Sequence, residues 1–232
     1  MSTDLQIGGR SAAIGTVRRN SMPVNDSAGI LWDDLRVTAN MMSLAGAQFS
    51  RPPRTVSILT NKARGPSFSG LQGYEFGYGR GVFQSGYFQV QLPHNYVPGT
   101  PIEPHVHVRL DPASKGEAGQ ILLLEFEYIW VNIREARPEN TRILAINHEV
   151  TKEDLLQDNV MISFGLVEKP DADISSMLDC RFSRITFDPE WGKDFWSSAG
   201  LQNDSFQGKL IFKEFDFHYR FDPRGSSRRD HR

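Results

Sequence analysis

The sequence predicts an all-β protein: an antiparallel, jelly-roll-like β-sandwich with an extended N-terminal arm and a short basic C-terminal tail. From Arg54 onward, apolar residues recur with a period of two, in short runs separated by Gly, Pro, Asn and Asp. No helical pattern lies between these runs, which leaves no room for the crossover helices of a βαβ fold. About eight such strands fit two packed antiparallel sheets, and a jelly roll is the expected topology.

Length and composition fit one domain with polar ends. The chain has 232 residues, a hydrophobic fraction of 39% and 15 Phe, which together can fill one core. Residues 1–29 are rich in polar residues and Gly without an apolar period, so we predict a flexible N-terminal arm, with ordering against a neighbouring subunit as the alternative. Residues 30–222 form the predicted sandwich. Residues 223–232 carry four arginines and form a basic tail, which is solvated or contacts phosphates or an acidic neighbour.

Net charge, hydropathy and cysteine content limit the partners and the chemistry that the chain can have. A net charge of −2 produces no overall field toward nucleic acid or lipid. No apolar run approaches the roughly 20 residues of a membrane helix. The N-terminus lacks the apolar region of a signal peptide, so we expect synthesis in a reducing cytoplasm. The single cysteine, Cys180, excludes an internal disulfide and a cysteine-based zinc site, and we expect it buried in a strand.

The elements follow from the pattern in order. Ile30–Gln48 is ambiguous, with room for a turn or two of helix in Ala39–Ala47. Thr151 is the expected N-cap of a helical turn at Lys152–Gln157, with Asp154 three residues on. The expected strands are Thr55–Leu59, Tyr87–Leu92, Pro104–Leu110, Gln120–Ile133, Ile143–Val150, Val160–Leu166, Met177–Phe187 and Lys209–Phe221.

The expected strands have one apolar and one polar face. Because successive side chains on a strand point to opposite sides, Leu122, Phe126 and Trp130 share one face of the long strand, and Phe215 and Phe217 one face of the last. Antiparallel sheets commonly bury one face and wet the other. We expect the polar faces of two strands to form an interface between subunits, where imidazole rings hydrogen-bond to carboxylates. The interface candidates are Glu103, His105, His107, Arg109, Glu214, Asp216, His218 and Arg220.

A metal site is the main chemical alternative. On a strand, His105 and His107 point to one side, so both imidazoles could reach one ion. The spacing from Gly99 resembles the first cupin motif, but Asp111 stands where that motif has Glu, Glu117 is too far on, and no second cupin motif follows. A threefold site with one His from each of three subunits is a further option. The prediction is that the chain holds no metal or cofactor.

Other catalytic patterns have little support. The run Gly77–Gly81 lacks the Lys-Ser/Thr of a phosphate loop and no helix pattern follows, so it is expected to be a flexible loop or hairpin. Glu125 and Glu127 share a strand face about 6.6–7 Å apart, which a glycosidase pair could use. Two carboxylates on a wet strand face are far commoner, and no surrounding motif supports a glycosidase. No Gly-X-Ser-X-Gly or His-Glu-X-X-His is present, and we predict that the protein is not an enzyme.

Three segments resemble a family of tailed-phage and prophage virion structural proteins. They contain Asp-Leu-Arg, then Leu-Pro-His-Asn-Tyr with Pro-His-Val-His, and finally Glu-Phe-Asp-Phe-His-Tyr. The family also has a long strand similar to Leu124–Tyr128, and the resemblance spans roughly Ile30 to Ser227. Val108 departs from the pattern, because many members carry Trp there. The three segments are Leu31–Val37, Gln91–His107 and Glu214–Ser226.

The resemblance implies a non-enzymatic virion component made in the cytoplasm of a host bacterium. We expect a homotrimer that decorates the head or sits at the tail or fibre base, with itself and other virion proteins as partners. Neither a membrane nor nucleic acid is expected as a partner. One alternative is a carbohydrate- or receptor-binding module on the tail, stacking sugars on Tyr74, Tyr78 and Trp196. A second is a cupin-like metal-binding protein using His105 and His107.

Overall fold

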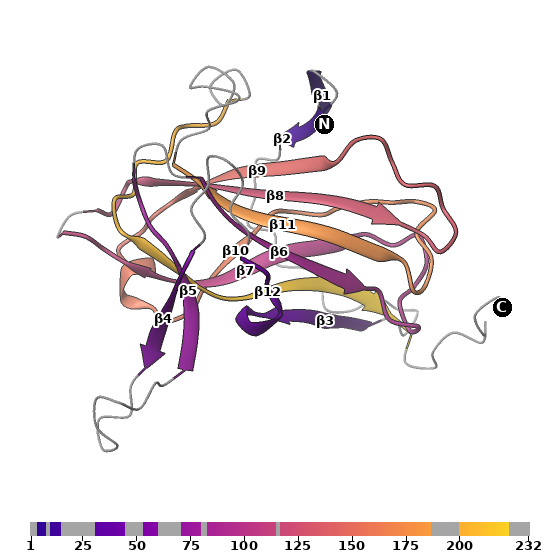
Figure 1. Ribbon diagram of the computed structural model, residues 1–232, viewed down its shortest axis with the longest axis horizontal. Helices are drawn as coiled ribbons and strands as arrows, with labels where there is room; N and C mark the ends of the chain where they lie inside the picture. Colours follow the sequence, from indigo (N-terminus) through magenta and orange to yellow (C-terminus); the bar gives the residue numbers. More distant parts are fainter. Residues whose placement is uncertain are drawn as a thin grey trace.

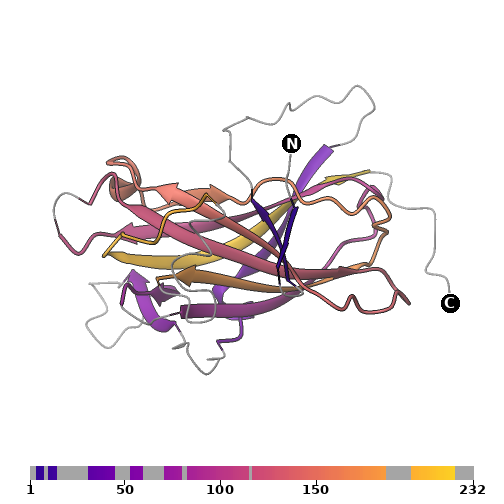
Figure 2. The ribbon, with the colours of Figure 1, turned by 90° about the horizontal axis from the view of Figure 1, so that it is seen from above.

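In the computed structural model of the protein, two β-sheets pack face to face (Figure 1; Figure 2). The structure describes residues 4–7, 10–14, 31–44, 53–59, 71–79, 83–114, 117–186 and 200–222. The strands are β1 (Asp4–Ile7), β2 (Arg10–Ile14), β3 (Leu31–Thr38), β4 (Arg54–Leu59), β5 (Leu71–Phe76), β6 (Phe83–Gln91), β7 (Ile102–Asp111), β8 (Ile121–Val131), β9 (Arg142–Glu149), β10 (Val160–Ser163), β11 (Met177–Ile185) and β12 (Lys209–Phe221). Two short 3₁₀ helices are η1 (Ala39–Met41) and η3 (Asp154–Leu156).

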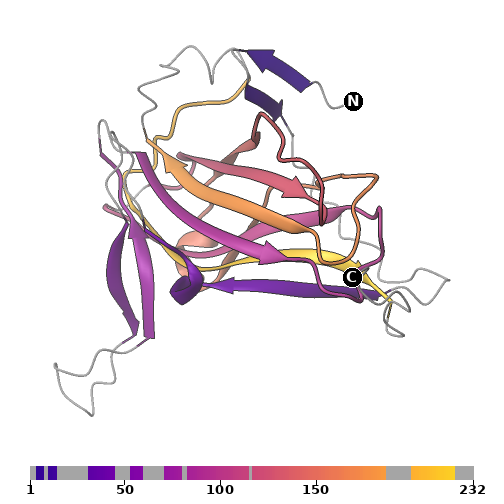
Figure 3. The same cartoon turned by 45° about the vertical axis from the view of Figure 1, so that its right-hand side comes forward.

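The strand order confirms the predicted antiparallel β-sandwich. One sheet runs β1-β2-β9-β8-β11-β6, and the other runs β10-β7-β12-β5-β4 with β3 also paired to β12. Eight strands make the body: β9-β8-β11-β6 face β10-β7-β12-β3, and all neighbours within these two sets are antiparallel. From β6 onward the chain alternates between the two sheets except at the β8–β9 step. Figure 3 shows the two layers, with β4 and β5 extending away from the body.

All eight predicted strands are present, but four further strands were missed. β3 lies in the segment that the sequence left ambiguous, and η1 is the only helical turn described there. β5 contains Gly73, which interrupts its apolar pattern. Inside the predicted arm, β1 and β2 are described as strands, and β2 runs parallel to β9. The rest of residues 1–29 and the tail 223–232 lie outside the described residues, so the flexible arm and the basic tail stay predictions.

The core is built from aromatic rings on the inner faces of both sheets. The predicted inner face of β8, from Leu122 to Trp130, is buried. Phe215 is fully buried on β12, and its ring centroid lies 5.0 Å from those of both Phe88 and Phe126. Val108, where the resembling proteins often carry Trp, is also fully buried. Burial of this many rings is the main source of stability for the fold.

A β-bulge lets the long strand β12 keep both halves facing the core. Its pairing with β7 shifts register between Phe212 and Glu214. The extra residue lets Phe212 and Phe215 both point inward, although strict alternation would place them on opposite faces. Beyond the bulge, Asp216 and His218 therefore lie on the outer face.

Thr151 makes the capping hydrogen bonds predicted for it, although η3 itself begins only at Asp154 and Glu153 directly precedes it. Thr151 Oγ1 accepts a hydrogen bond from the Asp154 backbone N–H at 3.0 Å, and Asp154 Oδ2 accepts one from the Thr151 N–H at 2.9 Å. This reciprocal pair is a capping box around η3.

Thr151→Ala should lower the free energy of unfolding by about 1 kcal/mol, because it leaves the Asp154 N–H without its acceptor. Equilibrium urea unfolding measures this change. Lys152→Ala, an exposed neighbour, is the control and should change stability by less than about 0.5 kcal/mol. Equal effects of the two substitutions would contradict the role of the cap.

Candidate functional site

The polar residues predicted on two strands come together on the outer face of the second sheet. In the pairing of β7 with β12, His105 is opposite Asp216 and Glu103 is opposite His218. On the other side of β12, β3 places Asp34 opposite His218. We call this group the outer-face cluster; its residues are Asp34, Glu103, His105, His107, Asp216 and His218.

Two imidazoles converge on one carboxylate oxygen within the cluster. His105 Nε2 lies 3.6 Å and His107 Nε2 lies 3.4 Å from Asp216 Oδ2. One possible ligand atom from each of the three side chains lies within 4.8 Å of the other two. The second carboxylate oxygen, Asp216 Oδ1, is buried and has no hydrogen-bond partner. Two imidazole nitrogens and one carboxylate oxygen are therefore close enough together to contact one ion.

The remote nitrogens of the two rings face acceptors. His105 Nδ1 lies 3.3 Å from the backbone oxygen of Glu103, and His107 Nδ1 lies 3.2 Å from Asn159 Oδ1. An oxygen at each Nδ1 favours a proton on that nitrogen. In the neutral rings, the lone pair is then on Nε2, directed toward Asp216.

His218 extends the cluster toward β3. Its ring centroid lies 4.1 Å from that of His105. Its Nε2 lies 3.0 Å from Asp34 Oδ1, and its Nδ1 lies 3.6 Å from Glu103 Oε2. Ser163 on β10 donates a 2.6 Å hydrogen bond to Glu103 Oε1. Four adjacent strands therefore contribute to one network.

The charges within the cluster stabilise each other. Burial alone would raise the pKa of Asp216, but His105 and His107 outweigh it and lower that pKa to about 2. Asp216 in turn raises the pKa of His107. The pKa of His218 is raised chiefly by Glu103, whose own pKa is lowered chiefly by His218. Asp216 is therefore ionised at neutral pH.

The expectation of a fully wet face is wrong at the centre of the cluster. His105 is 1% exposed and Asp216 is 2% exposed, although both point away from the core. The neighbouring rings of His107 and His218 lie close to His105 and help to shield it from water. Both imidazoles face Asp216 as predicted, but they do so within one chain and at distances longer than the predicted hydrogen bonds.

The remaining interface candidates are arranged around the cluster. Arg109 turns to Asp111, with a 2.8 Å bond from its Nε. Arg220 stacks over the Trp32 ring at 5.6 Å. Glu214 is opposite His107 in the pairing and is half-buried.

A glycosidase pair at Glu125 and Glu127 is not supported. Glu125 is buried rather than wet, and its Oε1 lies 2.7 Å from Arg181 Nη2. The same guanidinium nitrogen lies 2.6 Å from Glu127 Oε2. Both carboxylates are engaged in one structural ion-pair group.

The glycine-rich run, Glu117 and Cys180 each have a structural explanation. The described part of the run, Gly77 to Gly79, lies between strands β5 and β6. Glu117 accepts backbone N–H bonds from Ala113 and Ser114 and so holds the loop that follows β7. Cys180 is buried as predicted, and burial raises the pKa of its thiol well above the usual value.

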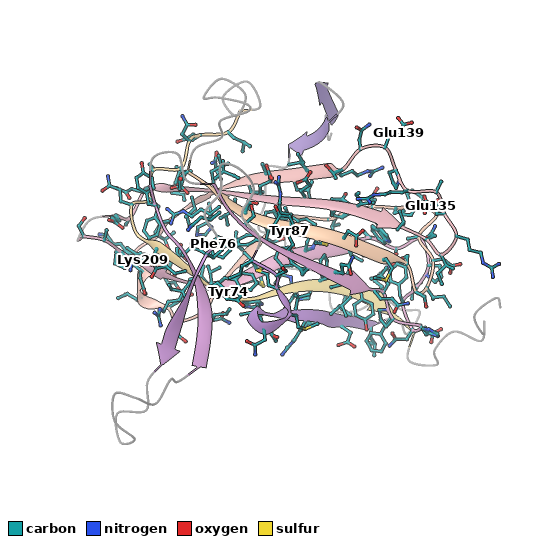
Figure 4. The ribbon with its side chains drawn as sticks, in the orientation of Figure 1. Tyr74, Phe76, Tyr87, Glu135, Glu139 and Lys209 are labelled. Carbon is teal, nitrogen blue, oxygen red and sulfur yellow. The ribbon has the colours of Figure 1, made fainter. Side chains whose placement is uncertain are left out.

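The aromatic residues predicted for sugar binding do not form a platform in the part that is described. Tyr74 packs against the core, and Tyr78 is 41% exposed with Arg184 lying 5.8 Å from its ring centroid. Figure 4 shows Tyr74 on β5. Trp196 lies outside the described residues, so carbohydrate binding stays untested.

The sequence did not identify several members of the network. Asp34 belongs to the ambiguous first segment, and only its pairing with β12 brings it to His218. Asn159 and Ser163 come from β10 and the turn before it. Alternation along β10 places Ser163 on the same face as Met161. This alternation was the only sequence signal that could have placed Ser163 on the outer face.

Comparisons with known proteins add distant similarities. No protein-family model matches the chain, and no curated protein matches it. Among solved structures, the enzymatically active domain of bacteriophage CBA120 tailspike protein 4 is 8% identical, with a TM-score of 0.34, over 80% of this chain and 19% of that one. TmCBM61, in complex with β-1,4-galactotriose, is 7% identical, with a TM-score of 0.28, over 82% of this chain and 87% of that one.

A structure of infectious bursal disease virus, Gx strain, is 7% identical, with a TM-score of 0.34, over 94% of this chain and 37% of that one. The chain therefore spans less than two-fifths of the tailspike and bursal disease virus chains. Similarities this low carry no argument about function, and the β-sandwich fold rests on the strand pairing of the chain itself. In the described part of the chain, no helix has the length and apolar character to cross a membrane.

Proposed function

We propose that the protein is a non-enzymatic structural component of a tailed-phage virion, assembled as a homotrimer that decorates the head or sits at the tail or fibre base. One observation carries the proposal. The three segments that resemble virion proteins are far apart in sequence but contribute the adjacent strands β3, β12 and β7. The three segments therefore share one sheet: some of their residues, such as Phe215 and Val106, are buried in the core, and the others lie side by side on the outer face. This arrangement is expected if the resemblance reflects a common fold and a common contact.

The nature of this surface favours binding over catalysis. Its charged groups are held by one another across four strands, which gives a rigid polar face. A rigid, pre-ordered surface loses little conformational entropy when a neighbour covers it. Partners are then other copies of the chain and other virion proteins.

An exposed apolar segment beside the cluster supports self-association. β10 is the last strand of its sheet, and Met161 on its outer face is 54% exposed. Leu156 and Leu166, which flank β10, are 87% and 56% exposed. Open sheet edges with apolar side chains are common sites of association, and closed symmetry lets one patch be used by every subunit.

The protein should have the mass of a trimer in sedimentation equilibrium at micromolar concentration. Met161→Glu combined with Leu166→Glu should dissociate it, because each trimer would bury several carboxylates. Ile133→Glu is the matched control: Ile133 is also 56% exposed but follows β8, and this variant should remain trimeric. A wild-type monomer, or dissociation by the control alone, would contradict the trimer.

Virion location has a separate test. Particles purified from cells that express the phage genes should contain the chain in fixed stoichiometry, measured by quantitative mass spectrometry. A density map of the particle then separates head from tail. Consistent absence of the chain from purified particles would refute the proposed location.

A further inference from the structure

We infer that His105, His107 and Asp216 form a binding site for one divalent transition-metal ion of the Zn²⁺ class. The inference is independent of the proposed function, since it concerns three side chains of one subunit. Two imidazoles and one carboxylate are a common ligand set for such ions. His107 is the most exposed of the three side chains, at 17%, so solvent would supply any fourth ligand from its side.

The distances between the donor atoms favour a metal over direct hydrogen bonds. The two imidazole–carboxylate separations, 3.6 Å and 3.4 Å, exceed the usual range of N–H···O bonds. Ligands held about 2.0–2.1 Å from a tetrahedral ion are about 3.4 Å apart. Among the other histidine–carboxylate pairs, His148–Asp154 and His218–Asp34 are at 3.0 Å and His218–Glu103 is at 3.6 Å. The separations around Asp216 Oδ2 match the spacing of ligands around one ion, and they involve two imidazoles at one carboxylate oxygen.

The hydrogen bonds at the Nδ1 atoms of the two histidines also favour a metal site. Acceptors at both Nδ1 atoms leave the two Nε2 atoms to face Asp216 Oδ2. In the neutral rings, both Nε2 lone pairs and the carboxylate oxygen then face one small space, and a divalent ion there would be bound by all three donors. Hydrogen bonding of the remote nitrogen to an oxygen is typical of metal-bound histidine.

The second oxygen of Asp216 is an independent indication. Asp216 is 2% exposed, yet its Oδ1 has no hydrogen-bond partner. A buried carboxylate oxygen without a donor is costly, and a bound ion or water is one way to satisfy it. Glu103 and Asp34 add further negative charge around His218, next to the site.

The site differs from the two metal arrangements considered from the sequence. The imidazoles point away from the core residues Val106 and Val108, so no ion would lie between the sheets as a cupin-like site requires. The third donor is Asp216 on β12 rather than a Glu after the His-X-His. All three donors come from one chain, so a threefold axis is not needed.

Zn²⁺ titration of the full chain, purified without an affinity tag and stripped with a chelator, tests the inference. Isothermal calorimetry should show one Zn²⁺ per chain, with no comparable binding of Mg²⁺, which prefers oxygen ligands. His107→Ala and Asp216→Asn should each weaken Zn²⁺ binding at least about 100-fold. Asn159→Ala, which removes only the acceptor for His107 Nδ1, should weaken it about tenfold.

The matched control is His148→Ala. His148 has the same 17% side-chain exposure as His107 and also pairs with an aspartate, but no second histidine of the described residues shares that aspartate. This variant should bind Zn²⁺ like the wild type. Unchanged Zn²⁺ affinity in His107→Ala, or no saturable binding in the wild type, would overturn the inference. Circular dichroism of each metal-free variant establishes whether it is folded. If Asp216→Asn does not fold, the Zn²⁺ affinity of His107→Ala alone tests the inference.

Discussion

Arg184→Ala should lower the free energy of unfolding by about 3–5 kcal/mol, because it leaves a buried carboxylate without its counter-charge. The side chains of Arg184 and Asp204 are both fully buried, with 3.0 Å between Nε and Oδ2. Arg184 also donates to the backbone oxygens of Phe76 at 3.0 Å and Gly208 at 2.7 Å, and to that of Phe206. One guanidinium therefore joins β11, the end of β5 and the segment leading into β12.

Urea unfolding followed by fluorescence measures this loss. Lys209→Ala is the control, because Lys209 also makes a 3.0 Å ion pair, with Glu75, but is half exposed. Its loss should cost no more than about 1 kcal/mol. Figure 4 shows Lys209 and Phe76 toward the same end of the molecule. Similar losses for Arg184→Ala and Lys209→Ala would show that burial does not govern the strength of this pair.

A double replacement separates charge from hydrogen bonding. Arg184→Met with Asp204→Leu removes both charges and keeps most of the volume, which often restores stability at buried pairs. Here it should restore only part of the loss, because the backbone oxygens of Phe206 and Gly208 lose their donor. Full recovery would show that those hydrogen bonds contribute little.

Phe215→Ala should lower the free energy of unfolding by about 3–5 kcal/mol. The Phe215 ring lies within 6 Å, centroid to centroid, of five other phenylalanine rings from both sheets, so the surrounding structure can close a cavity only by moving several rings. Phe215→Leu leaves a smaller cavity and should cost less. Chemical denaturation of both variants gives the comparison, and a loss below about 1 kcal/mol for Phe215→Ala would mean that the core collapses around the site.

The β-sandwich was predictable because apolar and polar residues alternate clearly in strands that bury one face and expose the other. The inner faces of β8 and β12 were predicted correctly for the same reason. β3 and β5 were missed because their apolar patterns are interrupted, by Asp33 and Asp34 in one and Gly73 in the other. Both strands hold their place in the sheet by pairing with β12. Local sequence patterns carry no information about such long-range pairing.

Five of the six residues of the outer-face cluster were predicted, Asp34 being the exception, but the geometry of the cluster was not. Alternation placed His105 and His107 on one polar face and Asp216 on another. The register that puts His105 opposite Asp216 depends on long-range pairing and on the bulge before Glu214. Burial of His105 could not be foreseen, because it results from neighbouring polar rings rather than from the core.

The position of β12 has a consequence for how the chain folds. This strand pairs with β7 on one side and with β3 and β5 on the other, yet it is the last strand of the described chain. During synthesis, β3, β5 and β7 leave the ribosome long before the strand that joins them. Their unpaired backbone must therefore remain available, and open to chaperones or to wrong partners, until the final segment inserts and closes the sheet.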